Sequence, residues 1–385
     1  MTQGGNKGQE WERWRTEFPI LEESVYLINN SLGAMPRQTP DALREYTRMW
    51  EELGVRAWEE SWWNLPRVIG DLIASIIGAW PGTVSIQPNV TTSQWIALSC
   101  LAGQERKKIV YSELNFPSVR YFYQAQPDLQ VEVVPCPDGM TVPVERMLDA
   151  IDENTLAVPI SHVIFKSSFI QDVRAVVEKA HRVGAYVILD TYHSAGIVPF
   201  SLQELEVDFA VGGVLKWLCG GPGVAFLYVR PDLADRIAPQ LTGWLAHERP
   251  FDFSPRLELS DGAYRFMSGT PNIPGLFAAR RGLEIIQEVG VARIRERSSM
   301  LTEFLIAAAD AASIPVRTPR NPRERGGHVT LSPERAESVS RHLLSHGFVI
   351  DYRPGAGIRV APHFFNTRDE LEHLVAEIGN FLERE

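Results

Sequence analysis

Two ionisable side chains, Asp190 and Lys216, each end a short apolar run within one stretch of the chain, residues 185–230. The first run is Tyr186 to Leu189 and the second is Phe209 to Leu215. Short apolar runs bounded by Gly, Pro and polar residues are typical of buried strands in an α/β sheet. Because such sheets bind ligands at their strand ends, this pair is the first candidate for a functional site.

An Asp and a Lys at neighbouring strand ends have a specific chemical use. A lysine can hold pyridoxal phosphate as a Schiff base, and a carboxylate facing the pyridine nitrogen keeps that nitrogen protonated. The protonated ring then withdraws electrons from the α-carbon of an amino acid. The same spacing also fits a buried Asp–Lys ion pair or two solvated charges, so the spacing alone leaves these alternatives open.

The small number of lysines limits which residue could form the Schiff base. The chain has only six lysines, and only Lys216 and Lys166 end an apolar run. Of these two, only Lys216 precedes a glycine cluster, residues 220–223. The sequence therefore favours Lys216 as the residue that would hold the cofactor.

The motifs around this pair continue along nearly the whole chain. They are Tyr26-Leu27-Ile28-Asn29-Asn30-Ser31-Leu32-Gly33, Asn115-Phe116-Pro117-Ser118, Asp190-Thr191-Tyr192-His193-Ser194-Ala195-Gly196, Lys216 with Gly220-Gly221-Pro222-Gly223, Gly243-Trp244, Ser268-Gly269-Thr270 and Gly357-Ile358-Arg359. In this order they resemble the class V aminotransferase family of pyridoxal-phosphate enzymes, and within it the kynureninases. Pyridoxal 5'-phosphate is the cofactor that this resemblance implies.

The resemblance implies an aspartate-aminotransferase-like α/β fold. A large domain, residues 51–275, would hold a mostly parallel seven-stranded sheet. A smaller α/β domain, residues 276–385, would follow, and an N-terminal arm, residues 1–50, would contribute to it. The chain's own pattern agrees, because strands alternating with helical segments predict a mostly parallel sheet with helices on both faces. At 385 residues and 44% hydrophobic, the chain can bury the cores of two domains.

The resemblance also gives roles to single residues. Lys216 and Asp190 would be catalytic, as Schiff-base lysine and partner of the pyridine nitrogen. Arg359 would clamp the substrate α-carboxylate with two hydrogen bonds. The other expected cofactor contacts are Phe116, stacked on the ring, His193, Trp244 and Thr270, and the other expected substrate contacts are Asn30, Ser31 and Asn272. Trp244 and Thr270 would act at a subunit interface, Thr270 from the neighbouring chain, which implies a homodimer with shared active sites.

Three hydroxyl residues, Thr91, Thr92 and Ser93, open a helix predicted to run to about Leu101. Hydroxyls at a helix start commonly cap the helix. The free N–H groups and the dipole at the same place also bind anions. With a phosphorylated cofactor expected, we favour Thr92 and Ser93 as phosphate contacts, followed by Thr91.

Departures from the kynureninase pattern affect the expected reaction. Leu215 stands where kynureninases carry a tyrosine that contacts the phosphate and takes part in proton transfer, and Val119 replaces an aspartate. We expect Cα deprotonation of an L-amino acid followed by side-chain cleavage, either C–C hydrolysis or β-elimination from an S-substituted cysteine, and Leu215 favours the second. A cysteine desulfurase is not expected, because no cysteine lies in the C-terminal region.

Three other functions remain as alternatives. An aminotransferase would need a keto-acid partner. A catalytically inactive regulatory protein that binds the cofactor would carry a DNA-binding segment or lack the lysine. A nucleotide-binding protein would want a GxGxxG motif after its first strand, which this sequence lacks.

The amino-acid composition limits the binding partners and the cellular location that we expect for the protein. The net charge of −10 argues against binding to nucleic acid or to a membrane surface. The three cysteines form no CxxC pair, so neither a disulfide framework nor a metal site is expected. Residues 1–10 lack the apolar core of a signal peptide, and no apolar run approaches the ~20 residues of a membrane span. We expect a cytoplasmic enzyme whose partner is a small amino-acid substrate.

Overall fold

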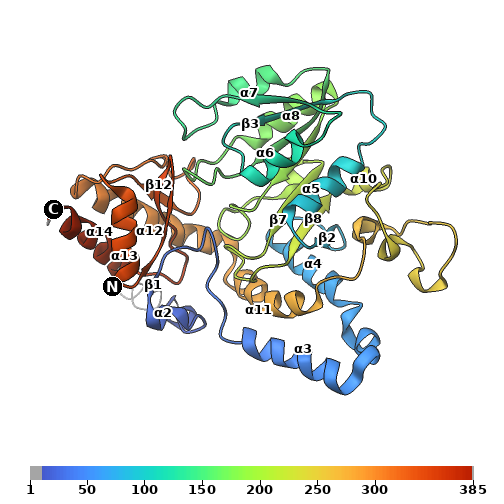
Figure 1. Cartoon of the computed structure of the whole chain (residues 1–385), viewed down its shortest axis with the longest axis horizontal. Coiled ribbons are helices and arrows are strands. Elements are labelled where there is room, and N and C mark those ends of the chain that lie inside the picture. Colours follow the sequence, from blue (N-terminus) through green and yellow to red (C-terminus); the bar gives the residue numbers. More distant parts are fainter. Residues whose placement is uncertain (1–10, 384–385) are drawn as a thin grey trace, which may run out of the picture.

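A seven-stranded sheet forms the centre of the molecule in a computed structural model that describes residues 11–383 (Figure 1). Its strands are β2 (Val84–Gln87), β3 (Lys108–Ser112), β4 (Gln130–Val134), β5 (Thr155–Ser161), β6 (Tyr186–Asp190), β7 (Phe209–Gly213) and β8 (Ala225–Val229). They lie in the order β2-β8-β7-β6-β5-β3-β4. The pairs from β7 to β4 are parallel, whereas β8 runs antiparallel to both of its neighbours. The mostly parallel sheet predicted from the sequence is confirmed.

Two smaller sheets lie in the C-terminal part of the chain. β9 (Val329–Leu331), β11 (Asp351–Arg353) and β12 (Gly357–Val360) form an antiparallel sheet with β12 in the middle. β1 (Val25–Tyr26) pairs in parallel with β10 (Phe348–Val349), so the N-terminal segment lies against this part. The division of the chain into parts at residues 50 and 275 stays a prediction.

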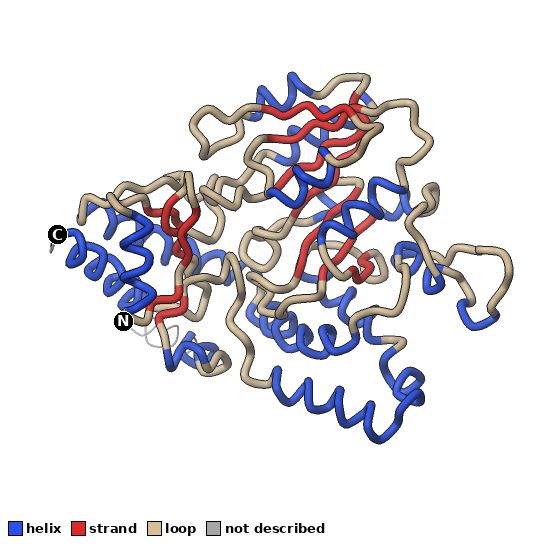
Figure 2. The backbone as a smooth tube through the Cα atoms, in the orientation of Figure 1, coloured by secondary structure: helices blue, strands red, loops and turns tan. Residues whose placement is uncertain are grey.

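Helices cover both faces of the central sheet (Figure 2). They are α2 (Ile20–Glu23), α3 (Thr39–Leu53), α4 (Leu65–Ile76), α5 (Val90–Ser99), α6 (Pro117–Gln124), α7 (Val144–Ala150), α8 (Val173–Val183), α9 (Leu202–Leu205), α10 (Pro231–Ala234), α11 (Ile273–Val289), α12 (Val291–Ala311), α13 (Ala336–Ser345) and α14 (Arg368–Glu383). Short 3₁₀ segments are η1 (Gly54–Arg56), η3 (Trp244–Ala246), η4 (Pro250–Asp252) and η5 (Gly262–Phe266), and η2 (Trp58–Trp62) is a π-helix.

Alternate residues of each central strand enter two different cores. On β6, Val187 and Leu189 pack with residues of α4, α7, α8 and α11, whereas Ile188 packs with residues of α5 and α6. Burying each such side chain contributes roughly 1.5–3 kcal/mol. These two apolar layers hold the strands in fixed positions, and with them the polar residues at the strand ends.

The chain enters and leaves the two key strands through specific turns. α8 ends at Gly184, whose φ of 73° is left-handed, so the chain reverses directly into β6. β7 ends at Gly213, two residues earlier than the apolar run predicted. The difference arises because the chain turns here: the N–H of Gly220 donates to the carbonyl of Val214 at 2.8 Å. Lys216 therefore lies in a tight turn just beyond the strand.

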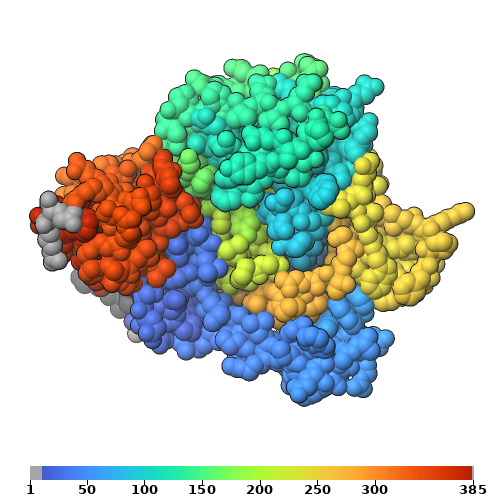
Figure 3. All heavy atoms as spheres, in the orientation of Figure 1, coloured from blue at the N-terminus to red at the C-terminus, as the bar shows by residue number. Residues whose placement is uncertain are grey.

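The segment between β8 and α11 is long and irregular, and part of it projects from the edge of the molecule (Figure 3, yellow). Its aromatic residues Trp244 and Phe251 pack against Trp63, which follows η2. Within residues 11–383, no helix is long and apolar enough to cross a membrane. Residues 1–10, on which the expected absence of a signal peptide rests, lie outside the described residues.

Candidate active site

The carboxyl ends of the neighbouring parallel strands β6 and β7 bring Asp190 and Lys216 to one cavity of about 350 Å³. Segments far apart in the sequence complete its wall. Eight residues predicted as site residues line it: Asn30, Ser31, Thr91, Phe116, Asp190, His193, Lys216 and Arg359. The cavity therefore gathers candidates from the N-terminal segment, the start of α5, three loops of the central sheet and β12.

The amine of Lys216 has a strongly lowered pKa in this cavity. Its Nζ lies 2.6 Å from Nε2 of His193 and 4.5 Å from the centre of the Tyr192 ring. Burial lowers the pKa of Lys216 to about 7, opposed by the charge of Asp190. A lysine with this pKa is partly neutral at physiological pH, so it can act as a nucleophile or as a base.

His193 is a neutral partner for this amine. Burial, followed by the charge of Lys216, holds the pKa of His193 well below its usual value. Its Nδ1 is buried and has no hydrogen-bond partner among the described residues. The imidazole therefore lies at hydrogen-bond distance from Nζ without adding a second positive charge to the cavity.

Asp190 is a buried carboxylate that favours a cation beside it. Its Oδ1 accepts a hydrogen bond from the N–H of Tyr192 at 2.9 Å. Burial raises the pKa of Asp190, against the opposing effects of the Tyr192 amide and the Lys216 charge. A protonated ring nitrogen next to Asp190 would offset the cost of burying this charge.

The start of α5 faces the same cavity, with Asn89, Val90 and Thr91 in its wall. Asn89 caps the helix, because its Oδ1 accepts from the N–H of Thr92 at 3.0 Å. The hydroxyl of Ser93 donates to the carbonyl of Asn89 at 3.3 Å, and the Ser93 side chain is buried in the protein. Of the three predicted hydroxyl residues only Thr91 lines the cavity, and phosphate contacts by Thr92 and Ser93 stay a prediction.

Arg359 is held in the cavity wall by Asp351 on the adjacent strand. Asp351 faces Arg359 in the register of β11 and β12, and it accepts from both Nε, at 2.9 Å, and Nη2. Nη1 of Arg359 donates to the carbonyl of Phe165 at 3.0 Å. Asp351 also accepts from Nη2 of Arg353, a second arginine in the wall, at 2.9 Å. One carboxylate thus orients two guanidinium groups.

Asn30 offers unpaired hydrogen-bonding groups to the cavity. Its side chain is fully buried, and neither its amide nitrogen nor its oxygen has a partner within residues 11–383. Leaving both groups unpaired in a buried site is costly, so they are suited to a polar ligand.

Three predicted site residues lie elsewhere in this chain. Trp244 stacks on Phe253 in the segment between β8 and α11, with its indole N–H donating to the carbonyl of Pro250 at 2.5 Å. Thr270 and Asn272 line a separate cavity of about 260 Å³. Asn272 caps α11 and donates to the carbonyl of Gly223 at 3.1 Å. Their predicted roles towards cofactor and substrate stay predictions.

Several residues in the cavity wall or beside it were not predicted as site residues. The face of the Tyr192 ring contacts the amine of Lys216. Arg353 and Asp351 form the charged cluster around Arg359. A signal for the latter exists in the sequence, because Asp351 and Arg353 are two residues apart and thus share one face of a strand. Asn89 could have been found as the cap before the three hydroxyl residues.

The donors of this cavity fit pyridoxal phosphate. Lys216 supplies a partly neutral amine, Asp190 a buried carboxylate for the ring nitrogen, and the start of α5 free N–H groups for a phosphate. The centre of the Phe116 ring lies 5.7 Å from Nζ of Lys216, in the cavity wall, where a flat cofactor ring would contact it.

Comparisons with known proteins agree with this fit. The family described as aminotransferase class-V matches residues 25–347. An uncharacterized aminotransferase, YcbU of Bacillus subtilis, is 31% identical over 96% of this chain and 97% of its own length. The kynureninase of Pseudomonas fluorescens is 31% identical over 96% of this chain and 92% of its own length.

Solved structures show the same fold at lower identity. A cysteine desulfurase from Thermococcus onnurineus superposes with a TM-score of 0.86 at 21% identity, covering 97% of this chain and 98% of that one. The enzyme C-DES, with glycine covalently linked to its pyridoxal phosphate cofactor, gives a TM-score of 0.87 at 20% identity over 95% of this chain and 99% of its own. The chain therefore belongs to the class V aminotransferase family of pyridoxal-phosphate-dependent enzymes.

Proposed function

We propose that this protein removes the α-proton of an S-substituted L-cysteine and then eliminates the sulfur group from the β-carbon. The observation that carries the proposal is the buried amine of Lys216, with its lowered pKa, 2.6 Å from the neutral imidazole of His193. A base of this kind suits proton abstraction at neutral pH, because its pKa lies near the working pH.

The wall residues divide the remaining tasks. When bound, the cofactor would supply the electron sink that acidifies the α-carbon. Asp190 would hold the ring nitrogen and Phe116 one face of the ring, while the start of α5 would hold the phosphate. Nζ of Lys216 would accept the α-proton, oriented by Nε2 of His193.

Arg359 would bind the α-carboxylate through the end of its guanidinium group. A guanidinium has five N–H donors. One on each of Nε and Nη2 goes to Asp351, and one on Nη1 goes to Phe165. One N–H therefore remains on each Nη, and both are available to a carboxylate. Binding of this kind would leave the contact with Asp351 in place.

The preference for β-elimination over C–C hydrolysis rests on Leu215 and Val119, which also line the cavity. Hydrolysis of a C–C bond requires an activated water, and neither of these apolar side chains can donate or accept a proton. A thiolate, in contrast, is a good leaving group and can take its proton from Lys216. The net reaction consumes one water and converts the S-substituted cysteine into a thiol, pyruvate and ammonium.

Transamination is a second candidate, favoured by the similarity to a protein named as an aminotransferase. It would use the same lysine to move the α-proton, but it would transfer the amino group to a keto acid instead of releasing ammonium. The side chain of the substrate would then stay intact.

A product assay separates these reactions. The cofactor-loaded enzyme is incubated with S-phenyl-L-cysteine, with L-kynurenine, and with L-alanine plus 2-oxoglutarate. Thiophenol and pyruvate from the first would support the proposal. Anthranilate from L-kynurenine without thiol release would instead indicate C–C hydrolysis, and glutamate alone an aminotransferase. Bound cofactor without any product would indicate an inactive binding protein. Lys216→Ala should abolish turnover, whereas the matched control Lys166→Ala should retain it.

We also propose a homodimer in which Trp244 and Thr270 reach the partner's site. Both lie outside the cavity of their own chain, and Trp244 is 39% exposed. Mixing Lys216→Ala subunits with Thr270→Ala subunits would test this. A shared site predicts that the mixture regains activity, since one of its two sites would be intact, whereas separate sites predict no recovery. A cytoplasmic location stays a prediction that cell fractionation can test.

A further inference from the structure

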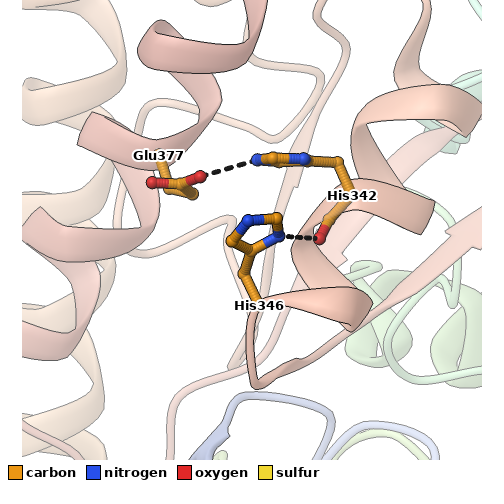
Figure 4. A group of neighbouring side chains, drawn as sticks. All are labelled: His342, His346 and Glu377. Atoms are coloured by element: carbon orange, nitrogen blue, oxygen red, sulfur yellow. Dashed lines mark hydrogen bonds and ion pairs between the residues drawn. The ribbon is translucent and has the colours of Figure 1, made fainter.

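Two histidines and a glutamate meet on the C-terminal part of the chain, away from the cavity of Lys216 (Figure 4). His342 lies in the last turn of α13, His346 is the residue that ends this helix, and Glu377 lies on α14. One ligand atom from each residue lies within 4.8 Å of the other two. Because residues four apart share a helix face, the His-x₃-His spacing aims both rings at α14.

The hydrogen bonds of the cluster decide which nitrogen atoms are available. Nδ1 of His346 lies 2.9 Å from the carbonyl oxygen of His342, which can only accept, so Nδ1 carries the hydrogen and Nε2 the lone pair. A carbonyl that fixes the tautomer in this way is typical of metal-binding histidines. Nε2 of His342 donates to Oε1 of Glu377 at 2.6 Å, so these two atoms already face each other, and Nε2 would give up this hydrogen on binding a metal.

Two imidazole nitrogens and one carboxylate oxygen form a donor set that suits Zn²⁺, which is bound at about 2.0–2.2 Å by these ligands. Calcium and magnesium prefer oxygen ligands throughout. In a tetrahedral site the ligand atoms are roughly 3.4 Å apart. Since the present atoms lie between 2.6 Å and 4.8 Å apart, small side-chain rotations would bring them to that spacing.

The surroundings favour a cation at this position. The cluster lies at the C-terminal end of α13, where free carbonyl groups and the helix dipole attract positive charge. The side chains of His342 and Glu377 are each only 16% exposed, whereas His346 faces solvent. A bound ion would thus be held by two mostly buried side chains and would keep a side open to solvent for a water ligand.

We propose that His342, His346 and Glu377 form a binding site for a divalent transition metal, best suited to Zn²⁺, that joins α13 to α14. The composition of the chain indicated no such site, because the donors are histidines and a glutamate from two helices instead of cysteines. The simpler alternative is a His342–Glu377 ion pair without metal, and it predicts no role for His346.

Equilibrium dialysis of the cofactor-loaded enzyme against ZnCl₂ tests the site, with thermal unfolding as a second measurement. We expect one Zn²⁺ per chain and a higher unfolding temperature with Zn²⁺. His346→Ala and Glu377→Gln should each weaken binding at least tenfold. His373→Ala is the matched control, because it removes an exposed histidine of α14 outside the cluster and should leave binding unchanged.

The visible absorbance of the bound cofactor shows whether each variant is folded. Replacing Zn²⁺ by Co²⁺ adds a spectroscopic readout, since tetrahedral Co²⁺ absorbs visible light and the band should disappear in His346→Ala. Absence of Zn²⁺ binding by the wild-type enzyme would overturn the proposal. Binding that survives both His346→Ala and Glu377→Gln would overturn it as well, because the ion would then lie elsewhere.

Discussion

Replacing Gly33 by alanine should displace the turn that carries Lys216. Gly33 is buried, and its N–H donates to the carbonyl of Leu215 at 2.7 Å. A Cβ atom built on Gly33 would lie 2.1 Å from the carbonyl oxygen of Lys216 and 2.9 Å from Cα of Cys219. Both contacts are to backbone atoms, so a side-chain rotation cannot relieve them. The N-terminal segment or the lysine turn must move by about 1 Å to reach a normal separation.

The size of the effect follows from these contacts. Overpacking of this kind typically costs about 1–3 kcal/mol, and loss of the Gly33–Leu215 hydrogen bond adds about 1 kcal/mol. We therefore expect the free energy of unfolding to fall by about 2–4 kcal/mol. A displacement of about 1 Å at a catalytic group can lower the rate by about 100-fold, which corresponds to about 2.7 kcal/mol of activation free energy.

Two measurements check this prediction. Exchange of the α-proton of a bound L-amino acid in D₂O, followed by NMR, reports on the position of Lys216 without requiring side-chain cleavage. Urea unfolding of the cofactor-loaded enzyme reports on stability. The control is Gly379→Ala on α14, where an added Cβ meets no atom within 4 Å and should be neutral or stabilising by up to about 1 kcal/mol. If Gly33→Ala exchanges the proton as fast as Gly379→Ala, the close approach of the two segments is refuted.

Three further predictions concern the same cavity. Because only the neutral amine is nucleophilic and burial lowers the pKa of Lys216 to about 7, cofactor uptake by the apoenzyme should accelerate as pH rises through about 7, and an unperturbed lysine would instead show its rise above pH 10. Arg359→Lys keeps the charge but loses the fork, so KM should rise at least tenfold, about 1.4 kcal/mol, with a smaller change in kcat. Asn89→Ala removes the cap of α5, so stability should fall by about 1 kcal/mol and cofactor should dissociate faster, as measured by unfolding and by dialysis.

The meeting of Asp190 and Lys216 could be predicted because it depends on strand order alone. Both residues follow apolar runs, and parallel neighbouring strands place their ends at one edge of a sheet. A glycine just after a helical segment is a signal for a helix end, and Gly184 ends α8 directly before β6. Features that depend on one element and its neighbour in sequence were therefore accessible.

The choice among Thr91, Thr92 and Ser93 could not be made in the same way. Successive residues of a helix are rotated by about 100°, so three consecutive hydroxyls do not all point in the same direction. Which of them faces the cavity depends on where the helix begins. Asn89 occupies the cap position and turns Thr91 to the cavity, whereas the hydroxyl of Ser93 bonds to the backbone. An error of one residue in the helix start changes the assignment.

The strength of Lys216 as a base is the least predictable property, because it belongs to the assembled site. Burial lowers the pKa of this amine, Arg359 and Arg353 lower it further, and Asp190 and Asp351 oppose them. Asp351 reaches this cluster only through the register of β11 against β12, which no motif in the sequence specifies. With β11 one residue out of register, Asp351 and Arg353 would both point to the other face of the sheet, and Arg359 would lose its carboxylate partner. The motif therefore identifies the lysine, but how readily it takes a proton depends first on burial in the assembled site and then on charges that include residues of two short strands in another part of the chain.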